Sequence, residues 1–248
     1  MIRRLITIVA AIAALSGSSF AQERENRIKF NEDADFSLRK GAFSAKLLSY
    51  IAFGDHYIMN AASGFDNAQK NSIETVVNIL ELRLHPYETG LIALGIDYDW
   101  DCYRLNKSSY WLPDTEKERV SIASIDNSGF KKIKKSNLIV RTLSAPVSFE
   151  QSFGKCALRI GAAVEYNFPG ITKFKAVDNN GAKVKENRDG ARYADKIKTN
   201  QITYNAFASL SYGGIGFYVK YNPMKQFVEG YAPQFKSITA GIICGLGM

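Results

Sequence analysis

The chain has 248 residues, 46% of them hydrophobic and 12% aromatic, and a formal net charge of +8. This composition excludes a disordered protein, and the length fits one large domain or two modest ones. No uninterrupted apolar run reaches the roughly 18 residues that a membrane-spanning helix needs.

Residues 1–21 have the pattern of a secretory signal peptide. Two arginines precede an apolar segment from Leu5 to Leu15, and small residues lead up to Ala21. We expect cleavage after Ala21, with an uncleaved anchor helix as the alternative. Residues 22–41 are polar and carry both charges, which predicts a periplasmic N-terminal segment. For an exported chain, nucleic acid is not an expected partner.

Eight segments of the remaining chain alternate apolar and polar residues with the period of a β-strand. The clearest example is the hairpin from Asn137 to Phe168, in which Leu158 and Ile160 share one face while Arg159 and Glu165 occupy the other. The predicted strands are 42–53, 73–84, 90–104, 138–150, 155–167, 199–211, 215–222 and 235–247.

The connections between these segments alternate strictly in length. The long ones are 54–72, 105–137, 168–198 and 223–234, and the short ones are 85–89, 151–154 and 212–214. Membrane barrels show this alternation, with tight periplasmic turns and long outer loops. The sequence therefore predicts an all-β fold: an eight-stranded antiparallel up-and-down transmembrane β-barrel in residues 42–248. The first strand should pair with the last, because an open sheet edge is costly in lipid. A soluble, lipocalin-like periplasmic barrel is the structural alternative.

The inward face of the predicted strands carries both charges. Eight strands leave an interior that side chains fill, so we expect an ion-paired network instead of an open pore. Its members are Lys46, Glu81, Arg83, Asp97, Asp99, Asp101, Arg159, Glu165 and Lys220.

Outward aromatic residues are expected to mark the membrane boundaries. The outer girdle is predicted to contain Tyr98, Trp100, Tyr166, Phe168 and Tyr221, and the inner one Phe149 and Tyr212.

The chain resembles the small outer-membrane barrels of the OmpA/OmpX type, and in particular the PorT-like outer-membrane β-barrel proteins. The resemblance rests on the signal peptide, the strand Leu143–Glu150, the strand Gly161–Asn167 and the glycine-rich strand Ile238–Gly247. It implies an outer-membrane location in a Gram-negative envelope.

Two clusters offer alternatives to a structural role. Asp97, Asp99 and Asp101 share one strand face, where three carboxylates suit a divalent cation, an acid/base pair, or the lining of a narrow channel or small-ligand site. His56, predicted in a loop beside Asp55 and Ser63, is the candidate centre of a lipid-modifying enzyme. We favour neither, and expect no catalytic site, no metal and no cofactor. The three cysteines are an odd number without metal-ligand spacing, so no disulfide framework is expected.

The two longest connections are basic. Residues 105–137 hold seven Lys and Arg against four Asp and Glu, and residues 168–198 hold eight against four. As extracellular loops they are candidates for contact with outer-membrane lipid, lipopolysaccharide phosphates or an acidic protein partner. The sequence thus predicts a monomeric envelope protein with a structural or interaction role.

Overall fold

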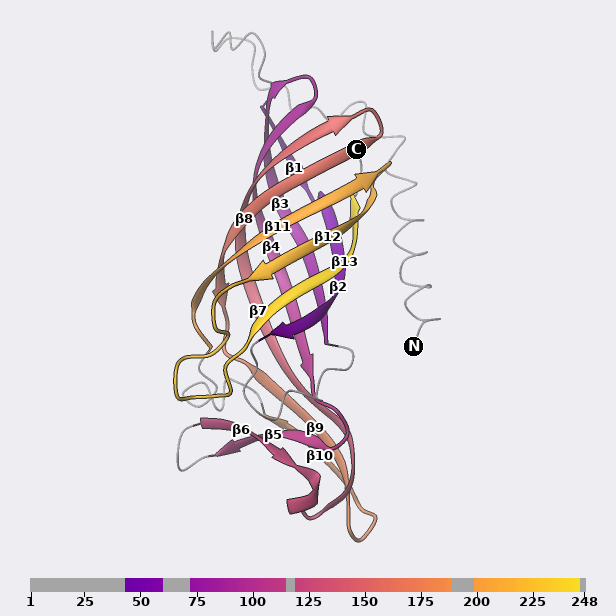
Figure 1. Ribbon diagram of the computed structural model, residues 1–248, viewed down its shortest axis with the longest axis vertical. Helices are drawn as coiled ribbons and strands as arrows, with labels where there is room; N and C mark the ends of the chain where they lie inside the picture. The colour runs from indigo at the N-terminus through magenta and orange to yellow at the C-terminus, as the bar shows by residue number, and fades with distance from the viewer. Residues whose placement is uncertain (1–42, 60–71, 115–118, 189–198, 246–248) are drawn as a thin grey trace.

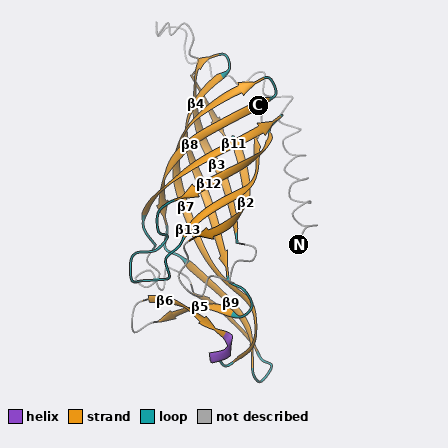
Figure 2. Ribbon diagram, in the orientation of Figure 1, coloured by secondary structure: helices purple, strands orange, loops and turns teal. Residues whose placement is uncertain are grey.

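The computed structural model describes residues 43–59, 72–114, 119–188 and 199–245 (Figure 1). In these residues it is an antiparallel all-β protein with one short 3-10 helix, η1 (Ile125–Asn127) (Figure 2). The strands are β1 (Phe43–Leu47), β2 (Tyr50–Met59), β3 (Ile73–Tyr87), β4 (Gly90–Arg104), β5 (Ser109–Asp114), β6 (Arg119–Ser124), β7 (Phe130–Phe153), β8 (Cys156–Asn167), β9 (Ile171–Asp178), β10 (Lys183–Arg188), β11 (Ile202–Tyr212), β12 (Ile215–Asn222) and β13 (Lys236–Gly245). The predicted signal peptide and residues 22–41 lie outside the described residues.

Eight of these strands pair in a cycle. From β2 the antiparallel pairings lead through β3, β4, β7, β8, β11 and β12 to β13. The strand β13 then pairs with β2, which is the pairing expected between the last and first predicted strands. We call these eight strands the strand ring. The described residues contain thirteen strands in all, five more than the eight predicted, and the ring accounts for eight of them.

The additional strands lie in the segments predicted as long loops. The 24-residue strand β7 continues past the ring, where it pairs with β9, and β9 pairs with β10. The strands β5 and β6 form a separate two-stranded sheet beside them (Figure 1). The prediction of loops at 105–137 and 168–198 is therefore wrong. Their dense lysines hid an alternation in which every second residue is buried, as with Thr172, Phe174 and Ala176 on β9.

The first predicted strand, 42–53, is also not continuous. It breaks at Leu48, whose φ of 52° lies in the left-handed region that a leucine rarely adopts. At the break the Ser49 amide donates a hydrogen bond to Asn78 Oδ1 at 3.1 Å. Beyond it β2 extends to Met59, so His56 lies on a strand and not in the predicted loop. Ser63 lies outside the described residues.

A β-bulge between Asn78 and Leu80 reverses the two faces of β3. A bulge inserts one residue, and a shift of one residue turns every later side chain to the other face. Val76, Leu80 and Leu84 would share one face in a strand without a bulge. Val76 precedes the bulge and is buried inside, whereas Leu80 and Leu84 follow it and lie on the outer side.

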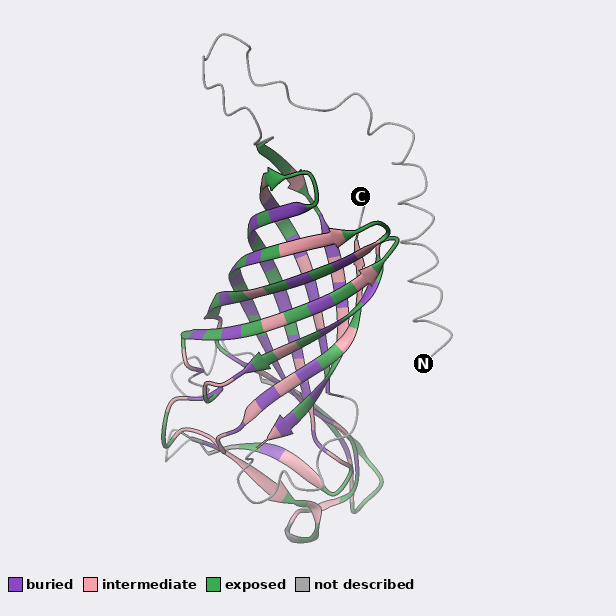
Figure 3. Cartoon of the chain, turned by 45° about the horizontal axis from the view of Figure 1, so that its top comes forward, coloured by how far each residue is buried: buried purple, intermediate pink, exposed green. Residues whose placement is uncertain are grey.

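Along the other ring strands, exposed and buried residues alternate (Figure 3). On β4 the apolar side chains of Ile92, Leu94 and Ile96 are 41–49% exposed, while Asp97 and Asp99 are buried. The ring thus has an apolar outer face and a polar inner face. Within the described residues, no helix has the length and apolar character needed to cross a membrane. The three cysteines are free thiols and half-buried.

We predict that Gly241→Val disrupts the seam between β2 and β13. Gly241 lies opposite Gly54, and a Cβ at this position would collide with the backbone of Phe53 and Gly54. Because overpacking of this kind costs about 1–3 kcal/mol, the variant should unfold at lower urea concentration and yield less folded protein in detergent. The matched control is Ala240→Val, whose side chain faces outward and is exposed. Equal stability of the two variants would contradict the pairing.

Candidate functional site

The interior of the strand ring near the short turns is held by a cluster of four charged side chains. Arg159 on β8 contacts Glu81 on β3 at 2.6 Å, and Glu81 also accepts from Arg83 Nε at 2.7 Å. Arg159 Nε lies 3.4 Å from Glu150, and its guanidinium stands 5.4 Å from the centre of the Tyr50 ring. Two bases and two acids thus neutralise one another here.

Lys46, also predicted in the interior, lies on β1 directly opposite Glu81 in the register and is half-buried. Its strand pairs with the part of β3 that follows the bulge. The lysine is therefore on the same face as Glu81, at the edge of this cluster.

The middle of the interior contains Asp97. The Tyr50 hydroxyl donates to one carboxylate oxygen of Asp97, and Asn78 Nδ2 donates to the other at 2.7 Å. Asn78 is fully buried, so the residue that interrupts the apolar pattern of its strand is a buried donor for this carboxylate.

Lys220 lies at the centre of the largest group. Its ammonium contacts Glu74, lies 3.2 Å from Asp99 and lies 3.7 Å from Glu165. Further donors satisfy the same carboxylates. The Tyr218 hydroxyl donates to Glu74, and Glu165 accepts from Thr203, Asn205 and Asn222. Buried carboxylates without such donors would be expensive, so the neutral donors matter as much as the single cation.

Sequence reasoning missed Glu74, Tyr50 and Tyr218 as members of this interior network. Glu74 precedes the bulge, so an unbroken two-residue period counted back from Glu81 and Arg83 assigns it to the outer face. The spacing of Glu74, Val76 and Asn78 at every second residue was the available signal, because two of the three are polar.

His56 is buried beside Asp101. Its Nε2 lies 3.0 Å from Asp101 Oδ1, its Nδ1 lies 2.8 Å from Thr239 Oγ1, and its ring stacks on Tyr103 with the centroids 4.8 Å apart. A carboxylate, an imidazole and a hydroxyl in a row are the parts of a nucleophilic triad. The cavity that these residues line holds only about 10 Å³, close to the size of one water, and it faces the interior and not lipid. The arrangement links β2, β4 and β13 and offers no room for a lipid substrate.

The three aspartates of β4 do not converge on one point. Asp97 is held by Tyr50 and Asn78, Asp99 by Lys220, and Asp101 by His56. Among the described residues, no group of three His, Cys, Asp or Glu side chains is placed to hold a metal ion.

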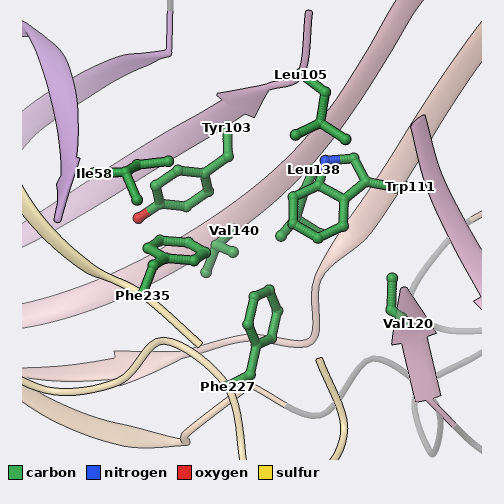
Figure 4. Close-up of a cluster of buried hydrophobic side chains, with 9 residues drawn as sticks. All are labelled: Ile58, Tyr103, Leu105, Trp111, Val120, Leu138, Val140, Phe227 and Phe235. Carbon is green, nitrogen blue, oxygen red and sulfur yellow. The ribbon is translucent and has the colours of Figure 1, made fainter. Parts of the chain in front are cut away.

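At the end of the ring that faces β5 and β6, beyond His56, the interior is closed by an apolar cluster, which we call the apolar cap (Figure 4). Tyr103 joins the cap to the charged interior, since it stacks on His56 and packs edge-on against Phe235 at 4.9 Å. The side chains come from the ring strands β2, β4 and β7, from β5 and β6, and from the connections that follow β4 and β12. The members are Ile58, Tyr103, Leu105, Trp111, Val120, Leu138, Val140, Phe227 and Phe235.

Two further cavities among the described residues of the ring are small. A cavity of about 40 Å³ lies between Asp99, Lys220 and Phe207, enough for a few waters. A second of about 70 Å³ lies near Arg83 and Glu150. Together with the apolar cap, this filling suits a plugged interior.

Comparison with models of protein families finds no match, and comparison with curated proteins finds none either. Among solved structures, the chain is similar to Ail, the attachment invasion locus protein of Yersinia pestis, in complex with the heparin analogue sucrose octasulfate. The identity is 10%, the alignment covers 83% of this chain and 98% of Ail, and the TM-score is 0.30. At a TM-score this low the similarity does not define the class of the protein, which rests on the geometry described above.

We predict that Arg159→Met destabilises the protein by about 3–5 kcal/mol, because it leaves Glu81 buried without its closest cation. Adding Glu81→Gln should recover part of that loss, since it removes a buried carboxylate that would keep only Arg83, the more exposed of its two cations. Urea unfolding in detergent micelles measures both effects. Lys155→Met, in the exposed turn between β7 and β8, is the matched control and should be neutral. A double variant as unstable as the sum of the two single variants would contradict the pairing.

Proposed function

We propose that the strand ring is an eight-stranded up-and-down β-barrel that crosses an outer membrane. The observation that carries the proposal is the inverted distribution of side chains, with apolar residues outside and charged residues inside. Phe217, Val164 and Ile160 are 74%, 59% and 54% exposed on the outer face, whereas Glu74 and Asp99 are almost fully buried. A soluble lipocalin-like barrel would have the opposite arrangement. An apolar belt of this extent is stable only against lipid or another apolar surface.

The orientation follows from the ends of the ring. The turns after β3, β7 and β11 are short and lie at one end, and the connections that contain β5, β6, β9 and β10 lie at the other. With the signal peptide predicted from the sequence, the short turns face the periplasm and the additional strands stand outside the cell.

The predicted girdle residues suit this placement. Tyr98, Trp100, Tyr166 and Tyr221 are exposed on the outer face, and Phe168 packs edge-on against Tyr166 at 5.4 Å. Phe149 and Tyr212 are exposed on strands near the short turns. Amphipathic rings at these levels would lie at the two lipid–water boundaries.

We infer a non-enzymatic envelope protein that acts through its extracellular strands. The filled interior argues against transport, and the enclosed His56 argues against lipid modification. Lipopolysaccharide and an acidic protein are the partners that the basic outer strands would suit, and the chain is proposed to act as a monomer. Membership of the PorT-like or OmpA/OmpX-type barrels stays a prediction from the sequence.

The topology predicts which lysines a membrane-impermeant amine reagent reaches on intact cells. Lys134 on β7 and Lys185 on β10 are exposed in the outer strands and should be modified, whereas Lys155 in a periplasmic turn should react only after the envelope is opened. Peptide mapping of protein from the outer-membrane fraction identifies the lysines that the reagent has modified. Modification of Lys155 on intact cells, or recovery from the soluble periplasm, would overturn the proposal.

We also predict that the purified protein gives no steady conductance in a planar bilayer. The charged interior and the apolar cap obstruct the ring independently, so the variant Trp111→Ala/Phe227→Ala should stay closed as well. An open, ohmic conductance of the unaltered protein would favour the narrow-channel alternative and its acidic strand face.

A further inference from the structure

Six lysines lie on one face of the three-stranded sheet formed by the outer part of β7 with β9 and β10. In the central row, Lys135 on β7 is opposite Lys175 on β9, and Lys175 is opposite Lys185 on β10. The neighbouring rows place Lys132 and Lys183 on either side of Val177, and Lys173 between two asparagines. We call this the lysine face, and its members are Lys132, Lys135, Lys173, Lys175, Lys183 and Lys185.

The register assigns these side chains to one face, because residues directly opposite each other in an antiparallel pair point the same way. The other face of the same sheet is packed. Ile133, Phe174 and Ala176 form a buried cluster there, with Tyr110 and Phe130 against it. The Phe130 and Phe174 rings meet edge-on at 5.1 Å. The lysines therefore stand on a sheet with its own core.

The described residues leave the positive charge of the lysine face without ion-pair partners. Within the described part of the chain, no ion pair involves any of its six lysines. Like charges directly opposite on a sheet are destabilising, and their Cβ atoms are only about 5 Å apart. Lysines on an edge strand can serve to block pairing with other chains, which would account for Lys183 and Lys185 on β10. That role does not account for Lys175 on the central strand.

We propose that the lysine face binds a linear acidic polysaccharide outside the cell. A polymer lying across the strands would meet an ammonium about every 5 Å along the central row, and its charge would relieve the repulsion within that row. Among the residues that the structure describes, this face carries no aromatic ring, whereas proteins that bind single-stranded nucleic acid combine basic with stacking residues. Compact ammonium groups also suit scattered charged substituents, since they do not require the planar, two-point contact that arginine makes.

The position of the face favours a polymer over the lipid of the same membrane, and here the inference rests on the proposed function. Lys135 is eight residues further out along β7 than Leu143, which is opposite the girdle residues Tyr98 and Tyr166. Eight residues of strand extend about 26 Å, so even with strand tilt the lysines would stand well above the lipid phosphates.

The test is binding of the purified full-length protein, in detergent micelles, to dextran sulfate at several salt concentrations, with neutral dextran as the blank. The variant Lys135→Gln/Lys175→Gln/Lys185→Gln should bind at least about tenfold more weakly at low salt, with a shallower dependence of affinity on salt because fewer charges are neutralised. The control Lys107→Gln/Lys155→Gln/Lys225→Gln removes the same charge from exposed sites elsewhere and should lose less than about twofold.

Equal losses in both triple variants, or no binding of the unaltered protein, would overturn the lysine face as a site. Equally tight binding of single-stranded DNA would overturn the assignment to a polysaccharide, and preferential binding to lipopolysaccharide vesicles would assign the face to the membrane's own lipid. Without polyanion, the central-row variant should unfold at the same or a higher urea concentration than the unaltered protein, since it removes like-charge repulsion. If both triple variants are recovered from the outer membrane, a failed binding test contradicts only this inference. If the protein is absent from the outer membrane, the proposed topology itself is contradicted.

Discussion

Lys220 reaches across the interior of the strand ring, and the packing of the ring depends on that contact. Its strand, β12, pairs only with β11 and β13, yet its ammonium meets carboxylates on β3, β4 and β8. Backbone pairing alone fixes neighbouring strands, whereas this group joins strands that are not neighbours. With water largely excluded, each carboxylate needs a donor within reach, and the hydroxyl and amide groups around Lys220 supply the remaining ones.

Two local irregularities make this interior possible. The left-handed Leu48 and the bulge after Asn78 lie next to each other, linked by the hydrogen bond from the Ser49 amide to the Asn78 side chain. Without the bulge, Glu74 and Glu81 would be on opposite faces of β3, because they are seven positions apart and side-chain direction repeats every two residues. The extra residue places both inside, one beside Lys220 and the other beside Arg159.

The outer part of the molecule divides into two surfaces with different properties. The apolar cap closes the ring and ties β5 and β6 to its rim. The sheet of β7, β9 and β10 has a separate core around Ile133 and turns its lysines to the outside. Soluble loops alone would not require the two packed cores at this end, the apolar cap and the cluster around Ile133. The additional strands form a platform, and one face of its three-stranded sheet carries the six lysines.

The sequence by itself determined the strand period, the alternation of long and short connections, and the charged inner faces of β4 and β8, because side-chain direction repeats every two residues in any extended strand. It did not determine the face of Glu74, the strand location of His56 or the row of Lys135, Lys175 and Lys185. A single inserted residue reverses a face, and residues far apart in sequence become neighbours only through the pairing register. Those contacts depend on bulges, strand ends and partner strands, so only the tertiary structure decided them.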